Sequence, residues 1–255
     1  MSAIRLEKKG PLVTARFDKP RGNAIDEPFT RELVDVARGL AGDTSIRGVM
    51  LASAHPKLFS PGLDLVALLE YDRPAMARFM ELFAEALWAL YGLPKPLVAA
   101  VGGHAIAGGC ILALTADFRV LRRGGVQIGL NEVKVGVPLP WSVALLLRAS
   151  VPPTALTPVA LLGRNFADDE ALAVGLADQL ADADGFEDFC LARLEEFADK
   201  DAASVAVTKG YLRDGVLRDM RAREASEISA WLDRWFSEPT RERVRQTVAA
   251  ITKTR

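Results

Sequence analysis

This chain is most constrained by two short glycine-containing stretches: residues 59–65, FSPGLDL, and residues 101–110, VGGHAIAGGC. Each stretch predicts the end of a strand, a tight turn and the start of a helix. The first N–H groups of a helix have no partner within the helix and can bind negative charge. If the two turns meet in space, the N–H groups of Leu63 and Gly108 can point at one oxygen atom and form an oxyanion hole.

Composition limits the classes of protein that fit this sequence. A chain of 255 residues that is 50% hydrophobic can bury a large core, as one domain or as a domain with an appendage. The 32 basic and 33 acidic residues form no long run of either sign, which argues against a nucleic-acid partner. The two cysteines, Cys110 and Cys190, are expected to be buried thiols, and a zinc site would need more ligands.

Neither a targeting signal nor a membrane span is expected. Residues 1–10 lack the pattern of a secretion signal or a transit peptide, so we expect a cytoplasmic protein. Residues 97–116 carry no charge and have the length of a membrane span. Because four glycines and His104 interrupt this segment, a buried strand, a turn and a core helix explain it better.

The first part of the chain predicts alternating strands and helices. Two short strands flank residues 9–11, and Asp26 is expected to cap a helix that ends near Gly39. A strand follows over 48–52, and Pro74 suits the first turn of a long helix. The sequence thus favours an α/β fold.

Further strands are predicted over 97–101, 118–121 and 126–128, again alternating with helical segments. This order is typical of stacked ββα units. The long helix predicted from Pro74 to about Tyr91 carries apolar residues at helical spacing. Such spacing indicates a stripe that faces the core, and the alternative is a groove for an acyl chain. These residues are Phe79, Leu82, Phe83, Leu87 and Leu90.

Beyond residue 184 the sequence predicts helices almost throughout. Asp184 and Glu187 have the spacing of a capping box. Trp231, Trp235 and Phe236 are apolar positions that fit either the core or an interface. We therefore divide the chain at this point into a core and a helical region.

Glu132 is the best candidate for a catalytic base. It lies in segment 127–133, a fairly apolar neighbourhood, where partial burial would raise its pKa toward neutrality and suit it to proton transfer. The simpler alternative is a solvated loop glutamate. Asp64 is expected to cap a helix rather than to act in catalysis, and His104 and His55 form no recognisable triad or metal site.

Taken together, these motifs resemble the crotonase, or enoyl-CoA hydratase/isomerase, superfamily, and within it the Δ3,Δ2-enoyl-CoA isomerases most. The resemblance is strongest between residues 47 and 179. It rests on RGVML at 47–51, FSPGLDL at 59–65, AGGCILALTADFRVL at 107–121, GLNE at 129–132 and VGLADQ at 174–179.

The resemblance implies a fold and an assembly. Crotonase-like proteins form a superhelical spiral of ββα units, so we expect residues 1–183 to be a spiral catalytic core that binds acyl-CoA. Residues 184–255 would be a C-terminal helical oligomerisation region, because helices in this part of family members build homotrimers or hexamers. The expected ligand is a CoA thioester as substrate, with no further cofactor and no metal.

The resemblance also assigns catalytic roles. The N–H groups of Leu63 and Gly108 would hold the thioester oxygen as an enolate, and Glu132 would transfer the proton. Hydratases of the superfamily generally carry a second glutamate, three residues after the second oxyanion glycine. Here that position is Ile111, whose hydrocarbon side chain can neither hold water nor transfer a proton.

These features favour an isomerase of fatty acid metabolism that moves a double bond from 3-enoyl-CoA to 2-enoyl-CoA. The segment 136–141, GVPLPW, is similar to the bulky isomerase version of this region, and its Trp141 is a candidate for the acyl pocket. The resemblance places the CoA moiety near Arg21, Lys57 and Leu58. Two alternatives stay open: a hydratase or another crotonase-type reaction, and a non-catalytic acyl-CoA-binding protein.

Overall fold

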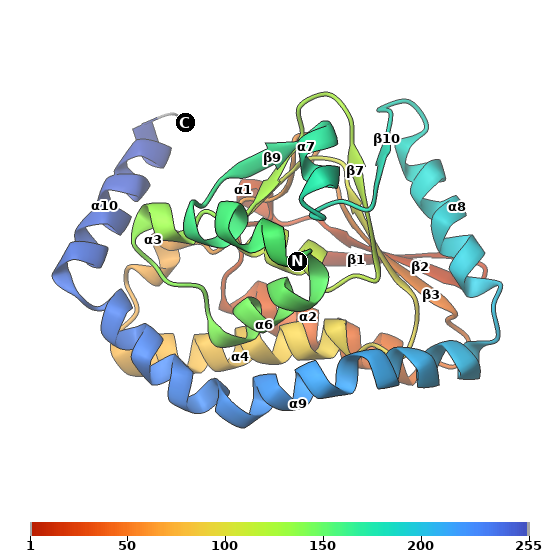
Figure 1. Cartoon of the computed structure of the whole chain (residues 1–255), viewed down its shortest axis with the longest axis horizontal. Coiled ribbons are helices and arrows are strands. Elements are labelled where there is room, and N and C mark those ends of the chain that lie inside the picture. Colours follow the sequence, from red (N-terminus) through yellow and green to blue (C-terminus); the bar gives the residue numbers. More distant parts are fainter. Residues whose placement is uncertain (1, 254–255) are drawn as a thin grey trace.

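The structure is a computed structural model that describes residues 2–253, without the side chains of Arg21 and Lys253 (Figure 1). Its larger sheet has six strands in the order β1-β2-β3-β5-β7-β10. The first pair is antiparallel and the other pairs are parallel. The strands are β1 (Ile4–Lys9), β2 (Leu12–Phe17), β3 (Gly48–Ser53), β5 (Leu97–Val101), β7 (Phe118–Arg122) and β10 (Gln179–Ala181).

A smaller sheet has the order β4-β6-β8-β9. Strands β4, β6 and β8 are parallel, and β9 is antiparallel to β8. Successive strands alternate between the two sheets, from β3 to β4, from β5 to β6 and from β7 to β8, which confirms the ββα spiral. The strands of this sheet are β4 (Leu58–Ser60), β6 (His104–Ile106), β8 (Gln127–Gly129) and β9 (Asn165–Ala167).

Two long helices begin as the sequence predicts. Helix α2 (Glu27–Gly42) is capped by Asp26, whose Oδ1 accepts from the N–H of Phe29 at 3.1 Å. Helix α4 (Arg73–Tyr91) has Pro74 in its first turn. The stripe on α4 is buried at Phe79, Phe83, Leu87 and Leu90 and half-buried at Leu82. Propensity and capping therefore set these boundaries before tertiary packing contributes.

The uncharged segment 97–116 folds as β5, β6 and α5 (Gly108–Leu114). Every residue of α5 is buried in the core. Of the helices that the structure describes, none is long and apolar enough to cross a membrane. Cys110 in α5 and Cys190 are both buried free thiols, as expected.

The later part of the chain is helical. Helix α8 (Phe186–Ala198) packs on the larger sheet, α9 (Ala202–Trp235) runs along α4 and α6 (Trp141–Ser150), and α10 (Glu238–Lys253) stands at the end of α9 (Figure 1). The predicted capping box is wrong, because α8 begins after Gly185 with no side-chain cap.

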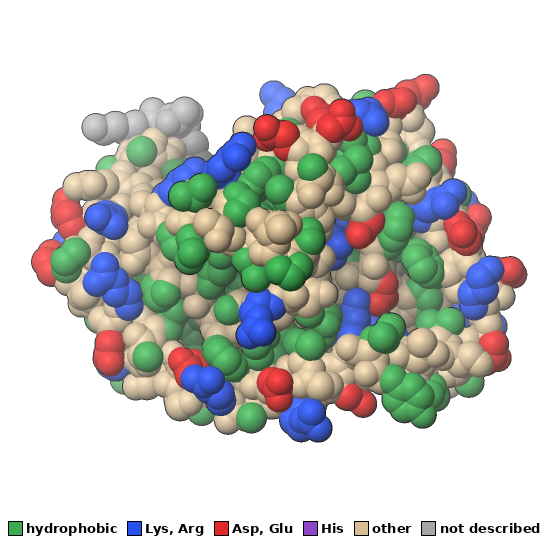
Figure 2. All heavy atoms as spheres, viewed as in Figure 1, with side chains coloured by type: hydrophobic (Ala, Val, Ile, Leu, Met, Phe, Trp, Pro, Cys, Tyr) green, Lys and Arg blue, Asp and Glu red, His purple; other side chains and the backbone are tan. Residues whose placement is uncertain are grey.

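Short helical segments complete the described chain. They are the α-helices α1 (Pro20–Asn23), α3 (Leu65–Leu68) and α7 (Asp168–Ala173), the 3-10 turns Glu132–Val135 and Pro153–Ala155, and the π turn Thr157–Leu161. Figure 2 shows one face of the molecule, on which acidic and basic side chains are interspersed. This face therefore presents no basic patch for nucleic acid.

Candidate active site

Three strands of the smaller sheet bring the predicted site together. Because β4, β6 and β8 are parallel neighbours, the segments after their last residues lie at the same edge of the sheet. Leu63 follows β4, Gly108 follows β6 and Glu132 follows β8. Residues far apart in sequence thus share one edge.

The first two turns are in van der Waals contact. A Cβ on Gly62 would lie 2.9 Å from the nitrogen of Gly108, and a Cβ on Gly109 would lie 2.1 Å from the carbonyl oxygen of Ser60. Real Cβ atoms do not approach so closely, so both positions need glycine. This contact fixes the distance between the backbone of the first turn and the N-terminus of α5.

The N–H of Leu63 is directed away from its neighbouring strand. Ile25 donates to the carbonyl of Gly62 and accepts from the N–H of Asp64, both at 2.8 Å. This is the bonding of a parallel bridge between Ile25 and Leu63, in which the N–H of Leu63 points to the other side. Within the described residues, no carbonyl accepts a hydrogen bond from it.

The N–H of Gly108 is available for another reason. Gly108 is the first residue of α5, and the first hydrogen bond of the helix runs from Ile111 N–H to the Ala107 carbonyl at 2.9 Å. The N–H of Gly108 therefore has no acceptor within the helix. Ala107, just before it, has φ +50° and ψ −120°, a conformation that costs an L-residue on the order of 1–3 kcal/mol. The strained backbone of Ala107 thus sets the direction in which α5 begins.

Glu132 is buried on the wall of the site. It begins a 3-10 turn and is only 9% exposed. Its Oε2 is buried and has no hydrogen-bond partner among the described residues. Burial raises the pKa of Glu132 to about 7. At neutral pH a large fraction of Glu132 is therefore the carboxylate that can accept a proton, and its conjugate acid is weak enough to hold the proton and then return it.

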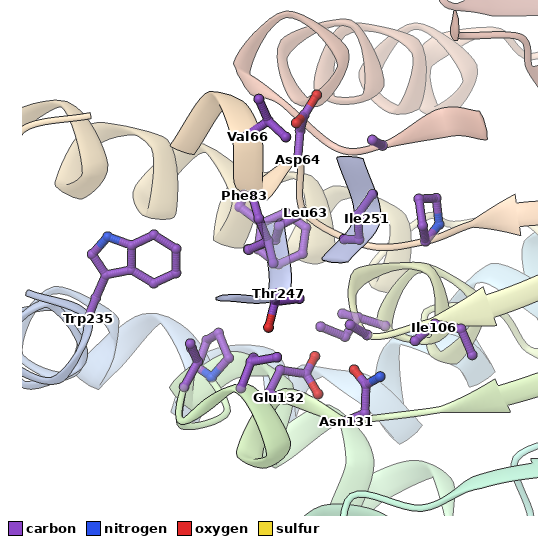
Figure 3. A pocket seen from close by; sticks show the side chains of 18 of the residues that line it. Leu63, Asp64, Val66, Phe83, Ile106, Asn131, Glu132, Trp235, Thr247 and Ile251 are labelled. Carbon is purple, nitrogen blue, oxygen red and sulfur yellow. The ribbon is translucent and has the colours of Figure 1, made fainter. Parts of the chain in front are cut away.

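Leu63 and Glu132 border a cavity of about 350 Å³, and Gly108 directly follows Ala107, which also borders it (Figure 3). Leu63, Ala107, Ile111, Asn131 and Glu132 line it on the side of the turns. The other carboxylate on its wall, Asp64, accepts from the Ala67 N–H at 3.3 Å and caps α3. Most of the remaining wall is apolar: Phe83, Ile106, Val135, Val137, Pro138, Pro140, Trp231 and Trp235. The cavity is therefore suited to an acyl group.

The residues predicted to meet CoA lie beside the first turn, outside the cavity lining. Lys57 is exposed, and Leu58 is half-buried at the start of β4. A Cβ on Gly22 would lie 2.4 Å from Cδ1 of Leu58, so α1 packs directly on this strand. Arg21 is in α1, but its side chain lies outside the described ones.

Trp141 is also outside the cavity lining. Its indole Nε1 donates to the Asp219 carbonyl at 3.1 Å, and the Arg223 guanidinium lies 4.2 Å from its ring centre.

The two histidines have backbone partners: His104 Nδ1 accepts from the Gln127 N–H at 3.0 Å, and His55 Nε2 lies 2.9 Å from the Lys19 carbonyl oxygen.

The C-terminal helices also contribute to the cavity, which the sequence did not predict. Trp231 and Trp235 of α9, and Thr247, Ile251 and Thr252 of α10, also line it. The helical spacing of the tryptophans indicated that they are buried. Spacing along a helix does not show which part of the protein the buried face contacts.

Comparison with known proteins identifies the family of this chain. A family model described as enoyl-CoA hydratase/isomerase matches residues 7–246. The chain belongs to this family. The family member described here is 32% identical to the mitochondrial enoyl-CoA delta isomerase 1 of Homo sapiens over 203 residues, 79% of this chain and 67% of that protein. Against the Rattus norvegicus protein of the same name, identity is 33% over 71% of this chain, which spans 64% of the rat protein's length.

Other relatives carry a different name. The carnitinyl-CoA dehydratase of Salmonella arizonae is 29% identical over 87% of this chain and 84% of that protein. Among solved structures, the human mitochondrial Δ3-Δ2-enoyl-CoA isomerase has a TM-score of 0.96 at 25% identity, with all of both chains covered. An enoyl-CoA hydratase from Bacillus halodurans shares the fold, with a TM-score of 0.89 at 20% identity.

Proposed function

We propose that this protein converts 3-enoyl-CoA to 2-enoyl-CoA with Glu132 as its only proton-transferring side chain. The observation that carries the proposal is the buried carboxyl of Glu132, whose Oε2 has no hydrogen-bond partner among the described residues. It lies on the wall of an apolar cavity, at the same sheet edge as the N–H groups of Leu63 and Gly108, which donate to no carbonyl of the described chain. In the proposal the thioester oxygen binds between those two N–H groups, and Lys57 and Leu58 meet the CoA moiety.

The reaction is a proton transfer in two steps. The Glu132 carboxylate takes a proton from carbon 2, and the C–H electron pair shifts to form an enolate whose charge rests on the thioester oxygen. The N–H groups of Leu63 and Gly108 stabilise that charge, and one such donor is worth about 3–4 kcal/mol in related oxyanion holes. The protonated Glu132 then returns its proton to carbon 4, which leaves the double bond between carbons 2 and 3.

Ile111 favours isomerisation over hydration. It is 2% exposed and lines the cavity, so the position of a second carboxylate presents hydrocarbon instead. Addition of water to a 2-enoyl-CoA needs a group that holds the water and moves its proton, and Ile111 has no polar atom. The relatives named carnitinyl-CoA dehydratase make a hydration or dehydration reaction the second candidate.

The test is an assay of purified protein with 3-enoyl-CoA and 2-enoyl-CoA, in which conjugation and hydration are followed separately. We expect conversion of the first and little hydration of the second. Glu132→Gln should lower kcat for isomerisation by about 10²- to 10⁴-fold. The matched control is Glu224→Gln, because Glu224 is also buried but binds Ser142 outside the cavity lining.

Each result has a distinct meaning. Near-normal isomerisation by a folded Glu132→Gln variant would exclude Glu132 as the base. Dominant hydration by the natural protein would favour the second candidate. Tight binding of CoA esters without turnover would indicate a non-catalytic acyl-CoA-binding protein. We also expect a homotrimer or hexamer, which light scattering on the eluting protein measures.

A further inference from the structure

The cavity has an aromatic end away from the smaller sheet. Figure 3 shows Trp235 on one side of the cavity and Ile106 on the other, with Glu132 between them. Phe83, Trp231 and Trp235 are all lining residues and at most 4% exposed. By contrast, Val66 and Ile251 line the cavity but are more than 40% exposed, and so lie at its rim. The aromatic end is therefore closed by buried rings.

The two tryptophans form a rigid unit. They lie one helical turn apart on α9, with ring centres 5.3 Å apart and planes inclined by 15°. The indole N–H of Trp231 donates to the carbonyl of Pro138 at 2.9 Å, which ties the pair to the loop before α6. Trp235 stacks on Trp231, and Trp231 is fixed by its hydrogen bond to Pro138. Because the interior is closely packed, Trp235 cannot easily rotate away from a ligand.

Two threonine hydroxyls on the wall of the cavity already have partners. The hydroxyls of Thr247 and Thr252 donate to the carbonyls of Arg243 and Val248, at 2.9 Å and 2.8 Å. The N–H of Trp231 is taken by Pro138. The indole N–H of Trp235 is buried and has no hydrogen-bond partner among the described residues. Figure 3 shows the six-membered ring of Trp235, and not the five-membered ring that carries this nitrogen, turned toward Phe83 and Leu63. The closed end thus presents carbon to a ligand.

We propose that Trp235, backed by Trp231, ends the acyl pocket and determines which substrates fit: acyl-CoAs whose acyl group has a hydrocarbon end and stops at the Trp235 ring. The inference rests on the proposed function, which places the thioester at the N–H groups of Leu63 and Gly108. With the thioester fixed there, the distance to Trp235 limits acyl length, because a longer chain would have to displace a buried ring.

The test measures binding, so it does not depend on turnover. Affinities of saturated acyl-CoAs from butanoyl to hexadecanoyl are measured by calorimetry with the natural protein, Trp235→Leu and Trp235→Phe. For the natural protein we expect affinity to rise about fourfold per added methylene and then to stop rising at a defined length. Trp235→Leu should move that limit to longer chains and improve binding of the first excluded acyl-CoA by roughly tenfold. Trp235→Phe should move it less.

The matched control is Trp141→Leu, since Trp141 is a tryptophan of the same region outside the cavity lining. It should leave the length limit unchanged. If Trp235→Leu does not fold, Trp231→Leu tests the same end of the pocket, because it removes the ring that supports Trp235. An unchanged limit in every folded Trp235 and Trp231 variant would overturn the proposal.

Two acyl-CoAs of equal shape, one charged and one uncharged at the acyl end, test whether the closed end of the cavity prefers a hydrocarbon group. Aromatic rings can also bind quaternary ammonium groups. We therefore compare 4-(trimethylammonio)butanoyl-CoA with its uncharged carbon analogue, 5,5-dimethylhexanoyl-CoA. We expect tighter binding of the uncharged ester, because the closed end offers no counter-charge. Preference for the cation would overturn the hydrocarbon assignment.

The two proposals fail separately. A length limit that moves with Trp235 in a protein that does not isomerise 3-enoyl-CoA would refute the proposed function and keep this inference. If the protein isomerises 3-enoyl-CoA but its acyl-length limit is unchanged in the Trp235 variants, the proposed function is kept and this inference is refuted.

Discussion

Gly109 lies so close to Ser60 that a Cβ on this glycine would be 2.1 Å from the Ser60 carbonyl oxygen. This contact between α5 and β4 holds the two turns of the candidate oxyanion hole at a fixed distance. Gly109→Ala should therefore force them apart, with a loss of about 1–3 kcal/mol in the free energy of unfolding and a loss of activity.

Urea unfolding of Gly109→Ala measures the first effect and the isomerase assay measures the second. Gly39→Ala is the matched control, because a Cβ at Gly39 in α2 meets nothing within 4 Å. It should gain up to about 1 kcal/mol of stability from helix propensity. A Gly109→Ala variant as stable and active as the natural protein would contradict this account of the site.

The activity of the protein should depend on the ionisation of Glu132. Since burial raises the pKa of Glu132 to about 7 and the carboxylate is the base, kcat/KM for 3-enoyl-CoA should rise with pH through about 7 and then level off. A pH–rate profile measures the midpoint. A midpoint near the ordinary glutamate pKa of 4.5 would show that Glu132 is not buried in the free enzyme.

The same shift in pKa predicts a pH dependence of stability. Between pH 4.5 and about 7 the folded protein holds a proton on Glu132 that the unfolded chain has lost. Raising the pH through this window should therefore lower the free energy of unfolding, by about 3 kcal/mol from this group. Glu132→Gln should lose this dependence and become more stable than the natural protein above pH 7. Glu81→Gln, at an exposed position of α4, should keep the dependence.

Ala107 adopts a backbone conformation that glycine adopts more readily, with φ +50°. Ala107→Gly should relieve the strain and raise the free energy of unfolding by about 1 kcal/mol, while isomerisation is retained. Ala105→Gly in the neighbouring strand β6 should instead lose about 0.5–1 kcal/mol, because Ala105 is fully buried in a regular strand. Thermal unfolding of both variants checks the opposite signs.

Ile111→Glu should add hydration to the activity of the protein. A carboxylate at this position of the cavity wall can hold a water molecule and move its proton, so hydration of 2-enoyl-CoA should rise at least about tenfold. The like charge should also raise the pKa of Glu132 further, which moves the pH–rate midpoint upward. Ile111→Gln is the control, since it can hold water but cannot transfer a proton. Equal hydration by both variants would show that position 111 acts only through polarity.

Local features of the chain were predictable from its sequence. The cap at Asp26, the proline in the first turn of α4 and the strand–turn–helix of the segment 97–116 all depend on near neighbours. The start of helix α8 was predicted less well, because two local signals, at Asp184 and at Gly185, compete there. The Asp184–Glu187 spacing suggests a capping box, yet α8 begins after Gly185, whose φ of +67° suits glycine and leaves Asp184 outside the cap.

The sequence by itself determined the glycine turns, the ββα order and the apolar surroundings of Glu132, because these follow from backbone freedom, periodicity and neighbouring residues. Only the tertiary structure decided that the turns after β4 and β6 touch, since parallel pairing joins strands more than forty residues apart. It also decided that Trp235 lines the cavity and Trp141 does not. Both residues lie on helices that bury some of their side chains, and the surface that such a helix covers depends on where the remainder of the chain packs.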